Sequence, residues 1–256
     1  MLFKRWLAIT IFVASFLGGS LANLPLSLFL GESRLGQSGL AAAAISGTIW
    51  RGEIKGLRLG PHRIGDVQLE ANPLFLFRLG YGGKAQITPG AAKGQGLFLL
   101  QSGPSLRLGN FAVIIDLAKL GYRDPNGRPV RGQLSLDLSG LHLRQQQGEI
   151  FCNSLEGYVG SDALSVLGKY YDKELPILRG VLGCEKGRIL LAIAGENEIA
   201  SIDISAEISA NFDYTANITI ETADREIQSL LILYGFNFVD NHYTLIERSN
   251  LAEGWR

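Results

Sequence analysis

Histidine and cysteine are the side chains of this chain best suited to catalysis or metal binding, so their spacing decides which chemistry is open to it. The histidines His62, His142 and His242 lie far apart on predicted strands, and none belongs to a His-x-x-x-His or His-x-x-Glu-His motif. No Gly-x-Ser-x-Gly motif, phosphate-binding loop or dinucleotide-binding glycine motif occurs. We therefore predict no catalytic residue, no metal site and no cofactor, and we expect a protein that is not an enzyme.

Cys152 and Cys184 are the two cysteines, and they do not form a Cys-x-x-Cys pair. In an oxidising compartment, two isolated cysteines most simply form one disulfide. That bond would close a loop of roughly 30 residues and contribute about 3 kcal/mol in the chain-entropy model. The alternative is two buried free thiols, and the choice depends on whether the chain is exported.

The amino terminus decides the compartment. Lys4 and Arg5 precede an uncharged apolar stretch at residues 6–24, which as a helix would span about 28 Å, close to the hydrocarbon core of a bilayer. The basic flank predicts that residues 1–5 form a cytoplasmic tail and that the rest is exported. We favour a retained transmembrane anchor, because apolar residues continue to Leu30. A signal peptide cleaved after Ala22 and a buried helix of a cytoplasmic domain are the alternatives.

Beyond a linker at residues 25–44, the chain has the pattern of a β-rich domain. Its 32 glycines have no collagen-like period and suit many short strands joined by turns. Apolar and polar residues alternate, most clearly around Ile202, Asp203 and Ile204, as in strands with one buried face. The chain carries 24 basic and 24 acidic residues, so it lacks the positive stripe expected of a nucleic-acid-binding protein.

Alternation and turn residues place the expected elements along the domain. Strands are predicted at residues 45–50, 54–59, 64–69, 84–88, 95–101, 106–115, 131–143, 151–159, 178–184, 188–194, 199–208, 212–221 and 242–247. Residues 73–79 fit either a helical turn or a buried strand. Short helices are predicted at 116–121 and 162–171. A longer one is predicted at 223–234, capped by Thr222 or Asp224 and ended by Gly235.

The predicted fold class is mainly β: an N-terminal transmembrane helix followed by a Gly-rich antiparallel β-sheet domain with a few short helices. Two similar halves are expected, at residues 45–128 and 129–250, with a tail at 251–256. Their similarity rests on short matches, such as Arg51-Gly52-x-Ile54 with Arg131-Gly132-x-Leu134. The alternative is that glycine-rich strands resemble one another without any duplication.

One stretch near the start of the domain is the candidate interaction motif. Its residues are Gly47, Thr48, Trp50, Gly52, Gly56, Leu57 and Gly60. Tryptophan buries a large area and often anchors either a core or a contact with a partner. Both interpretations are open for Trp50.

These motifs support a family resemblance. With its short anchor and the motifs Gly47-Thr48-Ile49-Trp50-x-Gly52, Gly56-Leu57-x-Leu59-Gly60-Pro61 and Gly127-x-Pro129-x-x-Gly132-x-Leu134, the chain resembles the type II secretion system protein N family (general secretion pathway protein N) over nearly its whole length. The resemblance implies a non-enzymatic accessory or scaffold component of the bacterial inner membrane. Its one membrane pass would carry a periplasmic domain that contacts other type II secretion components, and the family supplies no catalytic residues.

A second interpretation is a periplasmic lipid-binding or lipid-transfer module, because long Gly-rich antiparallel sheets can curl into an apolar trough. The two interpretations differ in what they require of the structure. An apolar groove open to solvent would favour lipid binding, whereas a closed core would favour scaffolding.

Overall fold

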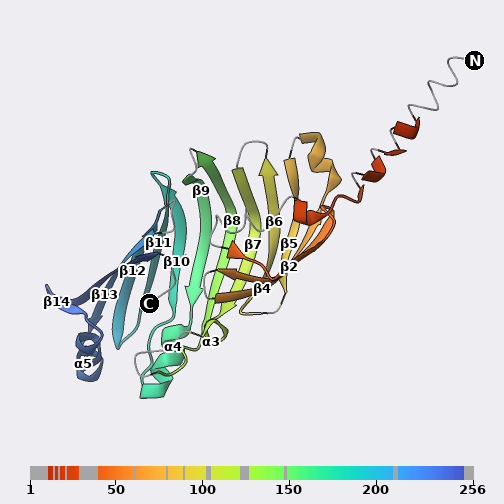
Figure 1. Cartoon of the computed structure of the whole chain (residues 1–256). Coiled ribbons are helices and arrows are strands. Elements are labelled where there is room, and N and C mark those ends of the chain that lie inside the picture. Colours follow the sequence, from red (N-terminus) through yellow and green to blue (C-terminus); the bar gives the residue numbers. More distant parts are fainter. Residues whose placement is uncertain are drawn as a thin grey trace, which may run out of the picture.

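The chain forms one large antiparallel sheet with a few short helices (Figure 1). This is a computed structural model, which describes residues 11–13, 15–16, 18–20, 22–28, 40–59, 62–78, 80–88, 90–101, 105–121, 127–146, 149–209 and 213–250. The strands are β1 (Leu40–Ala41), β2 (Ala44–Gly47), β3 (Arg51–Leu59), β4 (His62–Ala71), β5 (Gly80–Thr88), β6 (Ala92–Gln101), β7 (Ser105–Asp116), β8 (Gln133–Gln146), β9 (Glu149–Ser161), β10 (Leu178–Glu185), β11 (Arg188–Glu196), β12 (Ala200–Ile208), β13 (Asp213–Thr222), β14 (Asn237–Val239) and β15 (His242–Asn250). The mainly β antiparallel architecture predicted from the sequence is thereby confirmed.

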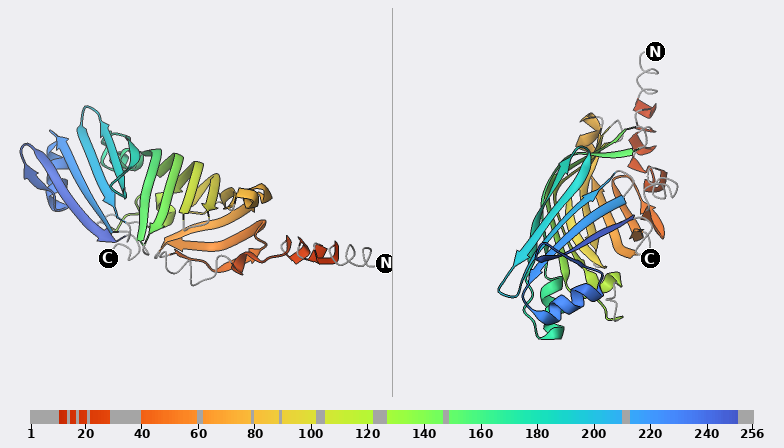
Figure 2. Two further views of the ribbon diagram at one scale, coloured as in Figure 1. Left: turned by 90° about the horizontal axis from the view of Figure 1, so that it is seen from above. Right: turned by 90° about the vertical axis from the view of Figure 1, so that its left-hand side faces the viewer.

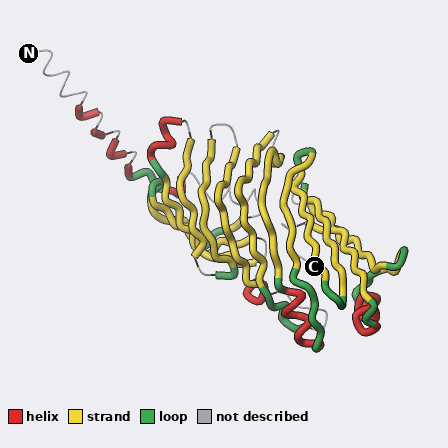
Figure 3. Tube along the Cα trace, turned by 180° about the vertical axis from the view of Figure 1, so that it is seen from behind, coloured by secondary structure: helices red, strands yellow, loops and turns green. Residues whose placement is uncertain are grey.

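The helices around the sheet are short: η1 precedes the first strand, and the others lie in connections between strands. They are η1 (Leu26–Leu28), η2 (Pro73–Arg78), α3 (Leu117–Leu120), α4 (Ala163–Gly168), η3 (Lys169–Tyr171) and α5 (Arg225–Leu233). The helices α3, α4 and α5 lie at one end of the strands and η2 at the other (Figures 1 and 3). Residues 73–78 thus form a helix rather than a buried strand, and Leu74 in it is 67% exposed.

The strands pair almost entirely in sequence order. Each strand from β3 to β12 is hydrogen-bonded to the next along the chain, and β13 pairs with β15. At the edges, β1 and β2 both pair with β3, and β14 lies outside β15. Because β7 pairs with β8 from Asp116↔Gln133 to Ser105↔Arg144, the sheet continues across residues 128 and 129. The division into two similar halves stays a prediction.

One face of the sheet is apolar along its whole length. A single row of cross-strand partners crosses every strand from β2 to β13 and ends on β15, a path of roughly 60 Å at about 4.8 Å per strand. The row consists of Ile45, Ile54, Val67, Ile87, Gly94, Val113, Leu136, Val159, Gly180, Ile193, Ile204, Ile218 and Leu245. We call it the apolar row. It contains only isoleucine, valine, leucine and glycine, and all its residues are buried or half-buried.

The neighbouring row on the opposite face is largely polar over the first strands. Glu53, Gln68, Gln86 and Gln95 are successive cross-strand partners on β3 to β6. Period-two alternation therefore places apolar side chains on one face and polar ones on the other, as expected for a sheet with one buried face.

Glycines reveal which way the sheet bends. A Cβ added at Gly94 would overlap the Ala112 carbonyl oxygen on the next strand and lie 2.9 Å from the Val113 Cα. A Cβ at Gly109, on the polar face, would meet nothing within 4 Å. Glycine lets neighbouring backbone approach closely where a sheet bends. The apolar face is therefore the concave one, and Figure 2 shows the bend from two directions.

The bend brings together elements that are separated within the sheet. The His62 ring, at the start of β4, has its Nδ1 3.1 Å from the Leu120 carbonyl oxygen at the end of α3. Between β4 and α3 lie the three strands β5, β6 and β7. The first part of the sheet is therefore curled, which helps bury Val67 and Val113 on its concave side.

Two separate buried clusters lie on the concave face. One joins Leu26, Ile54 and Val67 near the start of the sheet. The other joins Val159, Leu178, Ile193, Ala200 and Ile202 in the second part. Among the described residues, Leu26 is the one large side chain that is fully buried.

The predicted membrane anchor is only partly described. Residues 6–10 lie outside the described residues, and those described between 11 and 20 are helical. In the part of the chain that the structure covers, no helix is both long and apolar enough to cross a membrane.

Candidate functional site

The three histidines lie on strands that are far apart in the sheet. His62, His142 and His242 lie on β4, β8 and β15, and no group of three potential metal ligands occurs among the residues that the structure describes. Burial lowers the pKa of His142, and the nearby Arg107 and Arg144 lower it further. Burial and repulsion by these two cations both disfavour the charged imidazolium, and together they explain the lowered pKa.

The candidate interaction motif holds the chain segment that precedes the sheet. We call residues 24–28 together with Thr48–Gly52 the N-terminal clasp. The Ile49 backbone N–H donates to the Leu24 carbonyl oxygen over 2.9 Å, and Pro25 forms a β-bridge with Thr48. Leu26 packs onto Gly52, where an added Cβ would overlap the leucine Cδ2. Glycine at position 52 is therefore what makes room for the fully buried Leu26.

A tight turn supports the clasp from the other side. Gly47 has a φ of +85°, a conformation that favours glycine, and Thr48 Oγ1 accepts from the Trp50 and Arg51 N–H groups at 3.3 Å. The hydroxyl of Tyr81, whose pKa burial raises, donates to the Ile49 carbonyl oxygen over 2.6 Å. Trp50 itself is half-buried.

The remaining motif residues form a bulge in β3. Gly56 has a φ of +59°, and its N–H donates to Asp66 Oδ1 over 2.7 Å, beside a register shift between Ile54 and Leu57. Leu57 packs against the cluster around Leu26. Gly60 lies outside the described residues. The structure thus places Thr48, Trp50 and Gly52 in the clasp and Gly47 in the turn directly before it. It places Gly56 and Leu57 at the bulge.

A second candidate site is an apolar groove at the far part of the sheet. We define the α5 groove as the space of about 1030 Å³ between α4 with η3, α5 and the sheet surface of β12 and β13. Apolar side chains dominate its walls, among them Leu164, Leu167, Ile202, Ile220, Ile227 and Leu230. A volume near the upper end of small-molecule pockets, about 300–1,000 Å³, suits an elongated apolar ligand.

Charged residues hold the groove together at one end. Lys173 Nζ lies 2.6 Å from Asp224 Oδ2 and 3.0 Å from Glu226 Oε2, which ties the loop after η3 to the start of α5. Asp224 also caps α5 by accepting from the Glu226 and Ile227 N–H groups. The hydrogen bond from Lys173 is the main cause that holds the pKa of Asp224 below its usual 3.8.

The Lys173 ion pairs predict a pH-dependent contribution to stability. The pKa of Asp224 is lowered from its usual 3.8, and the hydrogen bonds from Lys173 to Asp224 and Glu226 raise the pKa of Lys173 from its usual 10.5. The ion pairs therefore contribute fully to stability between pH 3.8 and pH 10.5. This contribution is lost as the pH falls through the lowered pKa of Asp224 or rises through that of Lys173. Lys173→Met should lower the melting temperature at neutral pH, and the difference from the unmutated protein should shrink progressively below pH 3.8.

A matched control for that experiment is Lys55→Met. Lys55 pairs with Glu53 at 3.4 Å on the surface, with 55% of its side chain exposed, so its removal should change the melting temperature little at any pH. If Lys173→Met destabilised the protein equally at acidic and neutral pH, the pairing would not be the cause.

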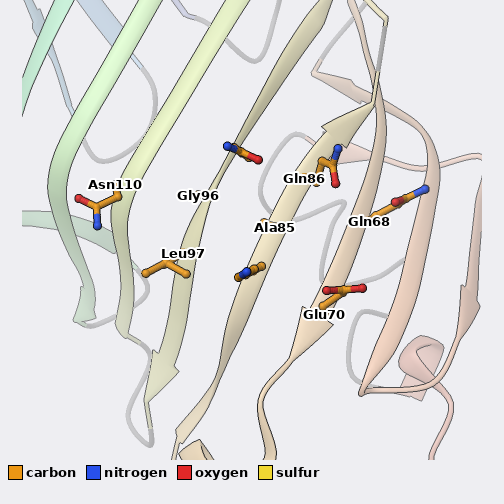
Figure 4. Close-up of a pocket in the computed structure, with 9 residues that line it drawn as sticks. Gln68, Glu70, Ala85, Gln86, Gly96, Leu97 and Asn110 are labelled. Atoms are coloured by element: carbon orange, nitrogen blue, oxygen red, sulfur yellow. The ribbon is translucent and has the colours of Figure 1, made fainter.

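A polar hollow of about 330 Å³ lies on the opposite face (Figure 4). Gln68, Gln86 and Glu70 extend from neighbouring strands around it, with Asn110 on the far side. The residues that line it include no histidine, cysteine or serine. It therefore offers amide groups and the cross-strand pair Glu70 and Lys84 as hydrogen-bonding partners.

The two cysteines lie where neighbouring strands separate. β9 and β10 pair from Ser161↔Leu178 to Gly157↔Leu182 and no further. Beyond that point Cys152 and Cys184 have Cα atoms 5.8 Å apart, a separation typical of disulfides, and the structure joins their sulfurs. The Cys152 N–H also donates to the Gly187 carbonyl oxygen over 2.9 Å.

We predict that removal of this bond destabilises the protein. Cys152→Ser with Cys184→Ser should lower the free energy of unfolding by about 2–5 kcal/mol, measured by urea denaturation. A reducing agent should produce the same loss in the unmutated protein and none in the double variant. Two alkylatable thiols in the unreduced protein would contradict the prediction.

Sequence reasoning missed two parts of these sites. The sequence predicts that Leu26 lies in a linker, and no pattern in it points to Lys173. An apolar residue directly after Pro25 was the available signal for Leu26. The sequence predicts the helix at 223–234, but it gives no sign that Ile227 and Leu230 on that helix line a groove.

Comparison with known proteins gives one match. The family model described as type II secretion system (T2SS), protein N matches residues 38–245. No curated protein and no solved structure matches the chain.

Proposed function

Because this chain belongs to the type II secretion system protein N family, we propose that it is a non-enzymatic inner-membrane accessory of the secretion machine, with a periplasmic domain that contacts other secretion components. Residues 6–24 would be the single membrane pass. The described part of that segment carries exposed apolar side chains on a helix, including Ile11, Phe12 and Phe16, as a lipid-facing helix requires. Residues 1–5 would stay in the cytoplasm.

The N-terminal clasp is the observation that carries this proposal. It fixes the sheet directly to residues 24–28, at the carboxyl end of the proposed anchor, through the buried Leu26 and the Leu24–Ile49 hydrogen bond. A domain held in this way keeps a defined position close to the membrane surface. That is the property expected of a scaffold, because a flexible tether would leave the position of its contact surfaces open.

Exposed apolar side chains on the convex face support protein contacts. Tyr158 and Val181 are cross-strand partners there and are 67% and 53% exposed. This pair therefore marks the position on the convex face where we would look first for a protein contact.

Photo-crosslinking in living cells tests the proposal. A crosslinking amino acid at Tyr158, or at the exposed Arg51 within the clasp, should yield products with other secretion components. The control position is Asn153, an exposed polar residue on the same strand as Tyr158. Only chain-internal products at both test positions would contradict a scaffold role, as would recovery of the chain in the soluble fraction.

The second candidate function is lipid binding, and the α5 groove is the observation that favours it. The groove is apolar and open to solvent, which is the feature that separates a lipid-binding trough from a closed core. It lies on the same concave face as the apolar row, which reaches Ile54 in the cluster around Leu26. Because the apolar row contains no charged side chain, acyl chains could lie along the concave face between the membrane and the groove. Native mass spectrometry of the full chain for co-purified phospholipid tests this function.

A further inference from the structure

We propose that the α5 groove binds the acyl chain of an anionic phospholipid, with Arg225 at the rim contacting the head group. This inference rests on the lipid-binding candidate function and assigns it a site and a ligand class. It follows from three properties of the groove: its lining, its charge and its connection to the membrane-proximal end of the sheet.

The lining fits a chain of methylene groups. Leu164 and Leu167 form one wall, Ile227 and Leu230 the opposite wall, and Ile202 and Ile220 the floor. Each buried methylene contributes about 0.8 kcal/mol, so a long acyl chain gains affinity from such walls without needing polar partners along its length.

The charge at the rim favours an anionic head group over a zwitterionic one. Three cations lie at or beside the groove: Lys173, Arg225 and Arg128, whose guanidinium stands 5.8 Å over the ring of the lining residue Tyr171. Both neighbouring carboxylates, Asp224 and Glu226, are bound by Lys173. Arg225 makes no ion pair within the described part of the chain and is exposed, so its guanidinium is available to a phosphate.

The connection to the membrane distinguishes a lipid from a protein segment as occupant. Ile202 and Ile220 in the floor stand two residues from Ile204 and Ile218 of the apolar row, on the same face of the sheet. That row ends at Ile45 and Ile54, and Ile54 contacts Leu26 just after the proposed anchor. A partner peptide would not need an uncharged path from the membrane to its groove, whereas an acyl chain would.

Photolabelling of the full chain in vesicles tests the assignment. The probe is phosphatidylglycerol with a diazirine at the end of one acyl chain, and labelled peptides are mapped by mass spectrometry. Labels are expected on the α4 and α5 peptides. Leu230→Glu places a carboxylate in the groove wall and should lower α5 labelling at least tenfold, a factor that corresponds to about 1.4 kcal/mol.

The matched control is Ile232→Glu, on the same helix. Ile232 is 62% exposed and does not line the groove, so labelling should persist. Arg225→Gln, an exposed change that should leave the fold intact, should reduce labelling by phosphatidylglycerol. A phosphatidylcholine probe should label weakly from the start. Melting temperatures of all three variants establish that each is folded.

The possible outcomes distinguish a failure of the α5 groove assignment from a failure of the lipid-binding function. Unchanged α5 labelling in Leu230→Glu, or equal labelling by both probes, would overturn the groove assignment while lipid binding elsewhere on the domain could stand. Labels confined to residues 6–24 would remove the lipid-binding function and the inference with it. Chain-to-chain crosslinks from α5 would identify a second copy as the occupant and would also overturn the inference.

Discussion

Gly180→Ala should destabilise this protein by about 3 kcal/mol or more, the upper end of what overpacking costs. Gly180 stands in the apolar row, where an added Cβ would overlap the Ala192 carbonyl oxygen and lie 2.6 Å from the Ile193 Cα. Both atoms belong to the backbone of β11, so β10 and β11 would have to separate. Urea denaturation followed by circular dichroism measures the loss.

The same strand supplies the control. Gly183 lies three residues further along β10, on the opposite face, where an added Cβ would meet nothing within 4 Å. Gly183→Ala should be neutral or stabilise by up to about 1 kcal/mol, because alanine loses less conformational entropy on folding than glycine does. Equal effects of the two substitutions would contradict the tight bend inferred for the concave face.

Leu26→Ala should cost about 2–5 kcal/mol, the range for truncation of a fully buried leucine. Leu26 is 0% exposed and packs against Ile54 and Val67. Its loss should also release the clasp, so the Ile49 amide, which donates to Leu24, should lose protection from hydrogen exchange. Stability is measured by urea denaturation, and the local release by exchange detected at peptide level.

Leu28→Ala is the matched control for the clasp. Leu28 stands two residues further along and is 67% exposed, so its truncation should change stability by no more than about 0.5 kcal/mol. If the two leucine variants behaved alike, the burial of Leu26 would not be what holds residues 24–28 to the sheet. Loss of exchange protection in both variants would lead to the same conclusion.

The elements could be predicted from the sequence because their signals are local. Alternation around Ile202, Asp203 and Ile204 predicted β12, and the same pattern predicted most of the other strands. The boundaries of α5 followed from Asp224, which caps it, and Gly235, whose φ of +84° ends it. The short β14 was missed, since three residues are too few to establish a period.

The sites could not be predicted because they depend on distant contacts. Leu26 belongs to the core only because β3 and β4 bring Ile54 and Val67 beneath it. Gly180 and Gly183 look alike in sequence, and only the bend of the sheet distinguishes them. The α5 groove exists because two connections far apart in the chain, one containing α4 and the other α5, leave the sheet at the same end.

The pairing of strands in sequence order has a consequence for biogenesis. Most strand pairs of the sheet join strands that are neighbours along the chain, so the paired residues are close in sequence. Topologies dominated by such local contacts fold quickly. Each strand can therefore pair with the one before it as soon as both have been synthesised. Before the next strand is made, the last strand has an unpaired edge that can pair with another chain. The disulfide between Cys152 and Cys184 can form only after β10 has been synthesised.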